Sequence, residues 1–166
     1  MIQVKETVAA DLPAIRDIYN YYIENSVITF EEVAWDDAAM QHKFDHIKED
    51  DYPFFSCYDG DQLVGYYYLS SWNFRSAYST TAEVTIYLAP SMTGRGYGRA
   101  LYEHLLATTD RQRFHSLIAC ITIPNEPSIA LHERFGFVQV SSIKEIGFKH
   151  DKWCDVGHWQ LILEKE

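Results

Sequence analysis

The amino-acid sequence predicts an α/β fold in a single domain that spans residues 1–166. Stretches with the alternating or continuous apolar pattern of strands are interspersed with stretches whose apolar residues recur at helical spacing. Both patterns occur together in residues 82–106, where a strand pattern, a turn with three glycines and a helical pattern follow one another. A length of 166 residues suits one domain, since domains commonly hold ~100–150 residues.

The N-terminal part predicts a strand and a helix. Residues 2–7 alternate weakly between polar and apolar side chains, as a first strand would. Asp11 is a suitable N-cap and Pro13 fits a first turn, so the helical spacing that follows predicts a helix to about Glu24. Residues 25–32 have flanks too polar for a central strand. We expect them to form an exposed loop near a site.

A second helix and a hairpin come next. Asp36 opens a helical pattern that runs to about Lys48. Residues 54–58 and 63–72 flank an Asp-Gly turn sequence and predict a β-hairpin. Because its second arm is apolar almost throughout, we expect that arm to be central in the sheet.

The C-terminal part alternates again between strand and helix. Residues 116–123 are largely apolar and predict a strand that a proline ends. Asn125 is a suitable N-cap for a helix with proline in its first turn, and Gly136 is a natural residue just after its last turn. Two last strands are predicted over residues 137–142 and 158–163.

Composition excludes several classes of function. A formal net charge of −10 disfavours general binding to nucleic acid or anionic membranes. The apolar runs are far shorter than the ~20 residues that span a bilayer, and the acidic N-terminal segment lacks a secretion signal. Three widely spaced cysteines favour neither a disulfide framework nor a metal site. We therefore expect a cytoplasmic protein that binds neither nucleic acid nor membrane.

Two histidines share one face of the second predicted helix. His42 and His46 are four residues apart, a spacing that also occurs in zinc proteases. That zinc motif requires glutamate directly after the first histidine, and Lys43 occupies this position. The pair therefore predicts a solvated helix face, and we expect no metal.

The three glycines of the central turn predict a phosphate site. Gly94, Gly96 and Gly98 recur at every second residue, so the backbone can adopt positive φ and approach a ligand closely. A strand, a glycine turn and a helix also direct several free N–H groups and the helix dipole at one point. For the loop alone, the less favoured alternative is an ordinary glycine-rich turn.

Two well-known phosphate motifs do not match this loop. A dinucleotide fingerprint that begins at Gly94 or Gly96 would need glycine or alanine at Arg99 or Leu101. A Walker loop would need a Gly-Lys pair, and no lysine occurs between residues 48 and 144. A third type of loop therefore remains.

The loop Thr93-Gly94-Arg95-Gly96-Tyr97-Gly98 resembles the Q/R-x-x-G-x-G/A pyrophosphate loop of the GNAT superfamily of acetyl-CoA-dependent acyltransferases, although it departs from that pattern at the first position. The segment Asn125-x-x-Ser128-x-x-x-His132-x-x-x-Gly136-Phe137 resembles a helix of the same superfamily. The resemblance implies a mixed, twisted sheet of six or seven strands with helices on both faces. It also implies that the sheet opens between the strand of Glu83 and the strand over 116–123.

A narrower resemblance covers nearly the whole chain. The sequence is similar to phosphinothricin and methionine sulfone/sulfoximine N-acetyltransferases. The segments that carry this likeness are Ile18-Tyr19-Asn20, Thr29-Phe30, Trp72, Arg75-Ser76-Ala77-Tyr78, Thr81-Ala82-Glu83, Tyr87, Gly147-Phe148-Lys149-His150, Trp153, Asp155-Val156-Gly157 and Trp159-Gln160. The resemblance implies acetyl-CoA as co-substrate, a small amine as acceptor, and a homodimer.

Acetyl transfer to an amine requires a base, because an ammonium group cannot attack a thioester. Glu83 is the candidate base, since it begins the strand that leads to the glycine turn and has apolar neighbours. Its alternative is a carboxylate at the rim of an edge strand, and the resemblance favours catalysis. His132 occupies the position where many GNAT enzymes place the tyrosine that protonates coenzyme A. An imidazole, with an ordinary pKa of ~6.5, can act there as acid or as partner base.

The resemblance also implies the binding residues. Backbone N–H groups freed by a bulge would bind the thioester and the pantetheine. The glycine turn and two arginines would hold the pyrophosphate. The start of the helix that begins at Asn125 would face the pantetheine from the other side. The cofactor residues are Ile86, Tyr87, Leu88, Gly94, Arg95, Gly96, Tyr97, Gly98, Arg99, Asn125 and Ser128. The expected acceptor residues are Phe30, Arg75, Ser76, Ala77 and Tyr78, with Arg75 as the anion anchor.

The sequence thus predicts acetyl-CoA-dependent N-acetylation of a small amino-acid-like amine by direct transfer. Two alternatives stay open at this point. One is acetylation of a protein N-terminus or lysine, which would need a long acidic or open groove, whereas the aromatic segment 72–78 suggests a small closed pocket. The other is a sensor that binds acyl-CoA without catalysis.

Overall fold

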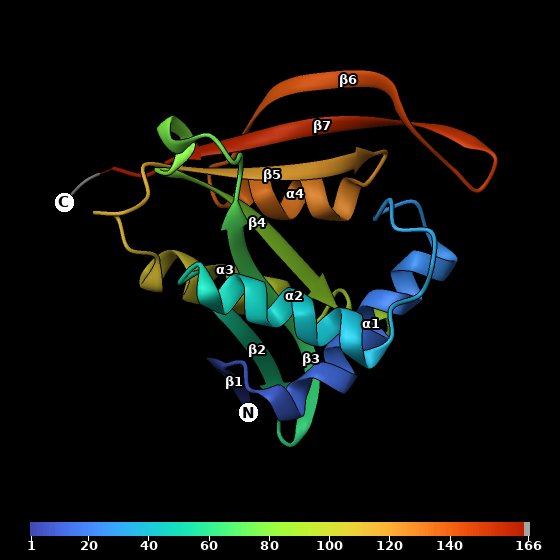
Figure 1. Ribbon diagram of the computed structural model, residues 1–166, viewed down its shortest axis with the longest axis vertical. Coiled ribbons are helices and arrows are strands. Elements are labelled where there is room, and N and C mark those ends of the chain that lie inside the picture. Colours follow the sequence, from blue (N-terminus) through green and yellow to red (C-terminus); the bar gives the residue numbers. More distant parts are fainter. Residues whose placement is uncertain (165–166) are drawn as a thin grey trace.

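The computed structural model describes residues 1–164, and within them a mixed seven-stranded sheet packs between four α-helices (Figure 1). Along the sheet the strands follow the order β1-β2-β3-β4-β5-β7-β6. The strands are β1 (Ile2–Glu6), β2 (Phe54–Asp59), β3 (Gln62–Ser71), β4 (Thr81–Leu88), β5 (Ser116–Ile123), β6 (Val138–Lys149) and β7 (Lys152–Ile162). The helices are α1 (Leu12–Asn25), α2 (Asp37–Glu49), α3 (Tyr97–Thr108) and α4 (Glu126–Arg134), with 3-10 turns η1 (Ala9–Asp11), η2 (Ser76–Tyr78) and η3 (Pro90–Met92).

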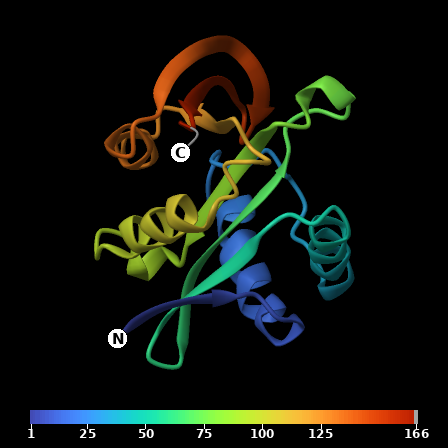
Figure 2. The same cartoon turned by 90° about the vertical axis from the view of Figure 1, so that its left-hand side faces the viewer.

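The helices cover both faces of the sheet, as predicted. Figure 2 shows α1 and α2 on one side and α3 and α4 on the other. The side chains of β3 alternate between the two covered faces. Tyr66 and Tyr68 face α1 and α2, whereas Tyr67, between them, points to the other face and contacts His104 of α3. A strand buried on both faces shows continuous apolar sequence instead of alternation. This confirms the central position predicted for the second hairpin arm.

The sheet opens between β4 and β5. These two strands are parallel and pair only over three residues, Thr81–Glu83 with Ser116–Ile118. All other neighbouring strands are antiparallel. Beyond Glu83 the two strands no longer pair, which leaves β4 with backbone groups that face no strand on that side. The predicted opening is therefore confirmed.

Several local predictions are also confirmed. The Asp36 carboxylate accepts a hydrogen bond from the N–H of Ala39, and the Asn125 side chain accepts one from Ser128. Gly136 has φ +88 just after α4. Asp11 is different, because its carboxylate accepts from the preceding Val8 N–H and from hydroxyl groups of β2 instead of capping α1.

The C-terminal hairpin is longer than predicted. The sequence predicts strands over 137–142 and 158–163, but β6 and β7 form one hairpin that runs from Val138 to Ile162. Its turn places His150 and Asp151 at positive φ, and β6 has two register shifts against β7. Such irregularities change which face each residue occupies, so they remove the alternation that indicates a strand.

Candidate active site

The glycine loop, residues 93–98, ends directly in α3. Gly94 and Gly96 adopt φ +75 and +90, and a Cβ at either position would meet no atom within 4 Å. Gly96 is the N-cap of α3 and offers no side chain, so the N–H groups of the first helical residues are free. The open backbone and the helix N-terminus together fit a pyrophosphate.

Gly98 has a different role from the other two glycines. It lies in the first turn of α3 and, contrary to prediction, does not adopt positive φ. A Cβ at Gly98 would meet Leu131 of α4 at 3.0 Å and Leu88 of β4 at 3.6 Å. This glycine therefore allows α3 to pack closely against α4 and β4.

The side chains around the glycine loop divide into buried and exposed ones. Tyr97 is buried, and its hydroxyl donates to the carboxylate of Asp59 at 2.7 Å, so only its backbone can serve a ligand. Arg95 and Arg99 are exposed. Arg99 pairs with Glu103 at 2.6 Å on the helix surface, a contact of low energetic weight that an anion could displace.

The backbone of β4 is the second part of the candidate cofactor site. Two hydrogen bonds show which way the backbone of β4 faces. The N–H of Ala89 donates to the carbonyl oxygen of Val64, on the side of β3. The carbonyl oxygen of Thr80 accepts from the N–H groups of His115 and Ser116, on the side of β5. Since hydrogen-bonding direction alternates along an antiparallel strand, Ile86 and Leu88 turn their N–H groups toward the unpaired side. Tyr87 turns its N–H toward β3, so its predicted backbone role is not supported by this geometry.

The predicted bulge is not what opens the sheet. The register between β3 and β4 is continuous from Gly65 opposite Leu88 to Ser71 opposite Ala82. The opening instead comes from the divergence of β5 after Ile118. The sequence resemblance does not distinguish a bulge in β4 from a divergence of β5 as the cause of the opening.

Glu83 is half-buried on β4, at the last residue that pairs with β5. Its side chain shares the face of Tyr68 and Tyr87, which α1 and α2 cover. Burial raises the pKa of the carboxyl above its ordinary value, while the charge of Lys43 and a hydrogen bond from Cys120 lower it. A carboxylate with a raised pKa at the opening of the sheet is suited to accept a proton.

The pKa of Glu83 sets the expected pH dependence of the reaction. A base must be ionised, so kcat/KM should fall as the pH drops through the raised pKa of Glu83, above the 4.5 of an ordinary glutamate. Rate profiles between pH 4 and 9 measure this acid limb. The limb should be missing from Glu83→Gln, and its persistence in that variant would assign it to another group.

His132 lies in the apolar interior beside α3. It is 3% exposed, and its ring packs edge-on against Tyr102 and Phe137. Its Nδ1 donates to the carbonyl oxygen of Ser128 at 2.7 Å. Burial lowers the pKa of His132, with a smaller opposite effect of that hydrogen bond. The imidazole is therefore neutral at neutral pH, with one proton held by the helix backbone.

Ser128 and Asn125 lie at the start of α4, where the sequence places them. The Ser128 hydroxyl is 3.4 Å from Nδ1 of His132, and the Asn125 side chain caps the helix. The structure thus joins all three residues in one hydrogen-bonded turn.

Phe30 lies in the loop between α1 and α2 and is 40% exposed. Its ring packs so closely on Gly147 that a Cβ there would come within 2.4 Å of it. The buried Lys149 donates to the carbonyl oxygen of Thr29 at 2.8 Å. The tip of the β6–β7 hairpin therefore holds this loop, a contact between distant segments that the sequence does not predict.

The segment with Arg75 lies elsewhere. Residues 75–78 are exposed in the loop that connects β3 with β4, and Ser76–Tyr78 form η2 there. The guanidinium of Arg75 stacks on the ring of Phe74 at 4.8 Å, and that ring is 87% exposed. This loop projects from the molecule in Figure 2, and Figure 1 places it opposite the loop between α1 and α2. The two predicted acceptor segments are not brought together within one chain.

Two residues near Glu83 are missing from the sequence prediction. Lys43, on α2, lies with its ammonium 5.2 Å from the centre of the Tyr68 ring. Ile118 of β5 pairs with Glu83, and Cys120, two residues further along β5, lies on the same face of the sheet. Desolvation, together with the Glu83 carboxylate, raises the pKa of the Cys120 thiol to about 12. In the sequence, the one signal that concerns Lys43 is its position directly after His42, where a zinc motif would need glutamate.

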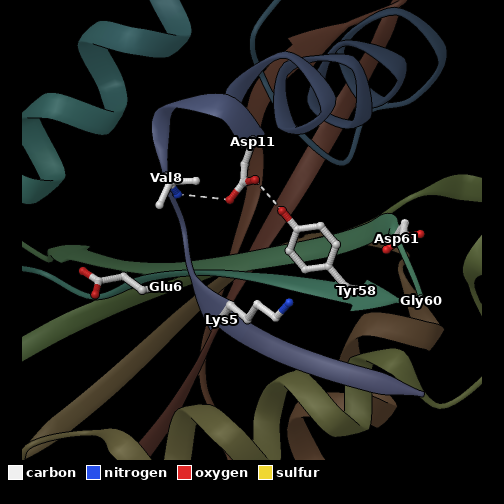
Figure 3. Close-up of a pocket in the computed structure, with 7 residues that line it drawn as sticks. All are labelled: Lys5, Glu6, Val8, Asp11, Tyr58, Gly60 and Asp61. Carbon is white, nitrogen blue, oxygen red and sulfur yellow. Dashed lines mark hydrogen bonds between the residues drawn. The ribbon is translucent and has the colours of Figure 1, made fainter.

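A hollow of about 310 Å³ lies away from these residues (Figure 3). Its lining comes from β1, η1 and the β2–β3 turn. In Figure 3 the Tyr58 hydroxyl points at the Asp11 carboxylate, whose Oδ1 accepts from it, while Oδ2 accepts from the Val8 N–H and the Ser56 hydroxyl. The Asp11 carboxylate therefore already has its hydrogen-bond donors within the protein. The lining residues are Lys5, Glu6, Val8, Asp11, Tyr58, Gly60 and Asp61.

Residues 1–164 contain no cluster of three or more histidines, cysteines or acids that could hold a metal ion. None of the helices in that part of the chain is long and apolar enough to cross a membrane.

The opened sheet and the glycine loop at a helix N-terminus are the features that the resemblance to acetyl-CoA-dependent acyltransferases predicts. The chain belongs to the GNAT acetyltransferase family, since the family model described as "Acetyltransferase (GNAT) domain" matches residues 4–158.

Among curated proteins, the chain is 35% identical to a phosphinothricin N-acetyltransferase of Streptomyces viridochromogenes, over 98% of this chain and 88% of the relative. It is 30% identical to an L-methionine sulfoximine/L-methionine sulfone acetyltransferase of Pseudomonas paraeruginosa, over 97% and 94%.

Solved structures show the same likeness. A phosphinothricin acetyltransferase from Sinorhizobium meliloti, in complex with AcCoA, is 36% identical with a TM-score of 0.93, over 98% of this chain and 88% of that one. A ribosomal-protein-alanine N-acetyltransferase from Brucella melitensis is 30% identical with a TM-score of 0.94, over 97% and 99%.

Proposed function

We propose that this protein transfers the acetyl group of acetyl-CoA directly to the amine of a small amino-acid-like molecule of the phosphinothricin, methionine sulfone or methionine sulfoximine type. The observation that carries the proposal is the half-buried Glu83 at the residue where β4 leaves β5. The curated relatives described above support the choice of acceptor.

Acetyl-CoA would supply the activated acetyl group. The backbone of Gly94 and Gly96 and the N-terminus of α3 would hold its pyrophosphate, with Arg95 and Arg99 adding positive charge nearby. The N–H groups of Ile86 and Leu88 would bind and polarise the carbonyl oxygen of the thioester. Asn125 and Ser128 would border the pantetheine from α4.

Glu83 would remove a proton from the acceptor ammonium, directly or through water, because only the free amine can attack. The raised pKa of Glu83 supports this role. A covalent route through Cys120 is disfavoured, since a thiol with a pKa of about 12 is almost entirely protonated at neutral pH. We assign His132 a positioning role, since its Nδ1 proton is held by Ser128 and its ring fixes α4 against α3.

A screen for thiol release tests the proposal. The protein would be incubated with acetyl-CoA and with amino acids, their phosphinic, sulfone and sulfoximine analogues, simple amines and short peptides. We expect release with the amino-acid analogues. Release with peptides alone would support protein acetylation, as in the structural relative from Brucella. Binding of acetyl-CoA without release by any amine would support a non-catalytic sensor.

We also propose a homodimer that forms through the C-terminal hairpin. The edge strand β6 and its partner β7 expose many large apolar side chains, and patches of this kind mark interaction surfaces. Val138 and Trp153, for example, are 65% and 64% exposed. The other exposed apolar residues of the hairpin are Val140, Ile143, Ile146, Phe148 and Ile162.

Replacing Val140 and Ile146 together by lysine should convert the dimer to a monomer, because two buried charges would be left unpaired. Light scattering coupled to gel filtration measures the change in mass. Ile2→Lys, on the opposite edge strand, is the matched control and should leave the dimer intact. A wild-type protein that is monomeric at every concentration would contradict the proposed dimer.

A further inference from the structure

The acceptor's own geometry limits where its carboxylate can bind. In an α-amino acid the amine and the carboxylate are attached to the same carbon atom. If the amine faces Glu83, as the proposed function requires, the group that binds the carboxylate must lie within a few ångströms of Glu83. This condition selects among the cationic side chains, and the inference below rests on the proposed function.

Lys43 lies over the same face of the sheet as Glu83. Its ammonium lies 5.2 Å from the centre of the Tyr68 ring. Tyr68 is opposite Thr85, and Glu83 is opposite Ser70, so Tyr68 and Glu83 are diagonal neighbours on one face. Such diagonal positions are ~7–8 Å apart in an antiparallel pair. Lys43 therefore lies over the same patch of sheet as Glu83.

The surroundings of Lys43 leave its ammonium available. Among the described residues it makes no ion pair within 4 Å. Lys43 also lines a small, partly open cavity of about 10 Å³, too small for more than one water. The residues around that cavity, apart from Lys43, are aromatic or apolar: Tyr19, Trp35, Met40, Phe54, Tyr66 and Tyr68.

The other cations nearby make contacts of their own. Arg16 pairs with Asp17 and Asp37. Lys149 is buried and donates to the Thr29 carbonyl oxygen. Arg75 stacks on Phe74 in the exposed β3–β4 loop.

We infer that Lys43 is the anion anchor of the acceptor site: its ammonium binds the α-carboxylate of a free amino acid while Glu83 faces the amine. The charge of Lys43 also lowers the pKa of Glu83, which agrees with their proximity. This arrangement favours free α-amino acids over simple amines and over peptide N-termini, where an amide replaces the α-carboxylate. It gives Lys43 the role that the sequence assigns to Arg75.

The test compares L-methionine sulfone with its α-carboxamide, which keeps the amine and the side chain but lacks the charge. Steady-state kinetics would be measured for wild type, Lys43→Met, Lys43→Arg and Arg75→Met at one pH. Any effect of Lys43 on the ionisation of Glu83 acts on both acceptors, so the ratio of their kcat/KM values isolates the anchor.

Lys43→Met should lower this carboxylate-to-carboxamide ratio by roughly 10- to 100-fold, mainly through KM, as expected for one lost charged hydrogen bond. Lys43→Arg should retain most of the ratio, and Arg75→Met should leave it unchanged. An equal loss on both acceptors in Lys43→Met, or a loss of the ratio in Arg75→Met alone, would overturn the anchor and leave the proposed function standing. A wild-type protein that acetylates neither compound would overturn both.

Discussion

Glu83→Gln is expected to lower kcat by ~10²–10⁴-fold, the usual contribution of a general base. Glutamine keeps the size of the side chain and its place beside Cys120, but it cannot accept the ammonium proton. The affinity for acetyl-CoA should remain close to that of the wild type, because Glu83 lies on the face covered by α1 and α2 and not in the glycine loop. Steady-state rates and calorimetry with acetyl-CoA measure the two quantities separately.

Glu6→Gln provides the matched control, since Glu6 is an exposed acid on β1 that pairs with Lys48. It should retain the wild-type rate. If Glu83→Gln retains most of its rate at neutral pH, then Glu83 is not the base and His132 becomes the leading candidate, despite its buried and hydrogen-bonded ring.

Gly96→Val is expected to weaken acetyl-CoA binding by ~100-fold or more, since charged hydrogen bonds from the loop backbone to phosphate would be lost. Gly96 has φ +90, a conformation that costs a residue with a Cβ roughly 1–2 kcal/mol. The Cβ would also project into the open space beside the helix N-terminus. Calorimetry measures the affinity, and thermal unfolding measures the stability.

Gly60→Val separates these two effects. Gly60 also has positive φ, at +60, with no atom within 4 Å of a Cβ, but it lies in the β2–β3 turn. Both variants should lose stability for the same reason, and only Gly96→Val should lose affinity. Wild-type affinity in folded Gly96→Val would show that the glycine loop does not bind the pyrophosphate.

Most of the fold could be predicted from the sequence because local signals and burial agree there. Asp36, Asn125 and Gly136 have the helix-end roles that their chemistry favours. The sequence predicts too short a β6–β7 hairpin because local signals and burial disagree there. Its register shifts and its exposed apolar residues disturb the strand pattern, and neither can be recognised without the partner strand.

The candidate site was predictable only where the chain is locally continuous. Only the short turn η3 separates the glycine loop from β4, so the position of the loop relative to Glu83 follows from the sequence. Lys43 and Cys120 reach Glu83 through packing of α2 and pairing of β5, which depend on the whole fold. The divergence of β5 and the helical role of Gly98 likewise depend on neighbours distant in the sequence.

The central claim is that the acceptor is a free amino acid. It is tested most directly by the kcat/KM for L-methionine sulfone compared with that for a dipeptide in which methionine sulfone is the N-terminal residue. The two acceptors share the α-amino group and the side chain, and in the dipeptide an amide and a second residue replace the α-carboxylate. The account predicts a preference of at least ~10-fold for the free amino acid, the effect of one charged hydrogen bond. An equal or higher kcat/KM for the dipeptide would contradict it.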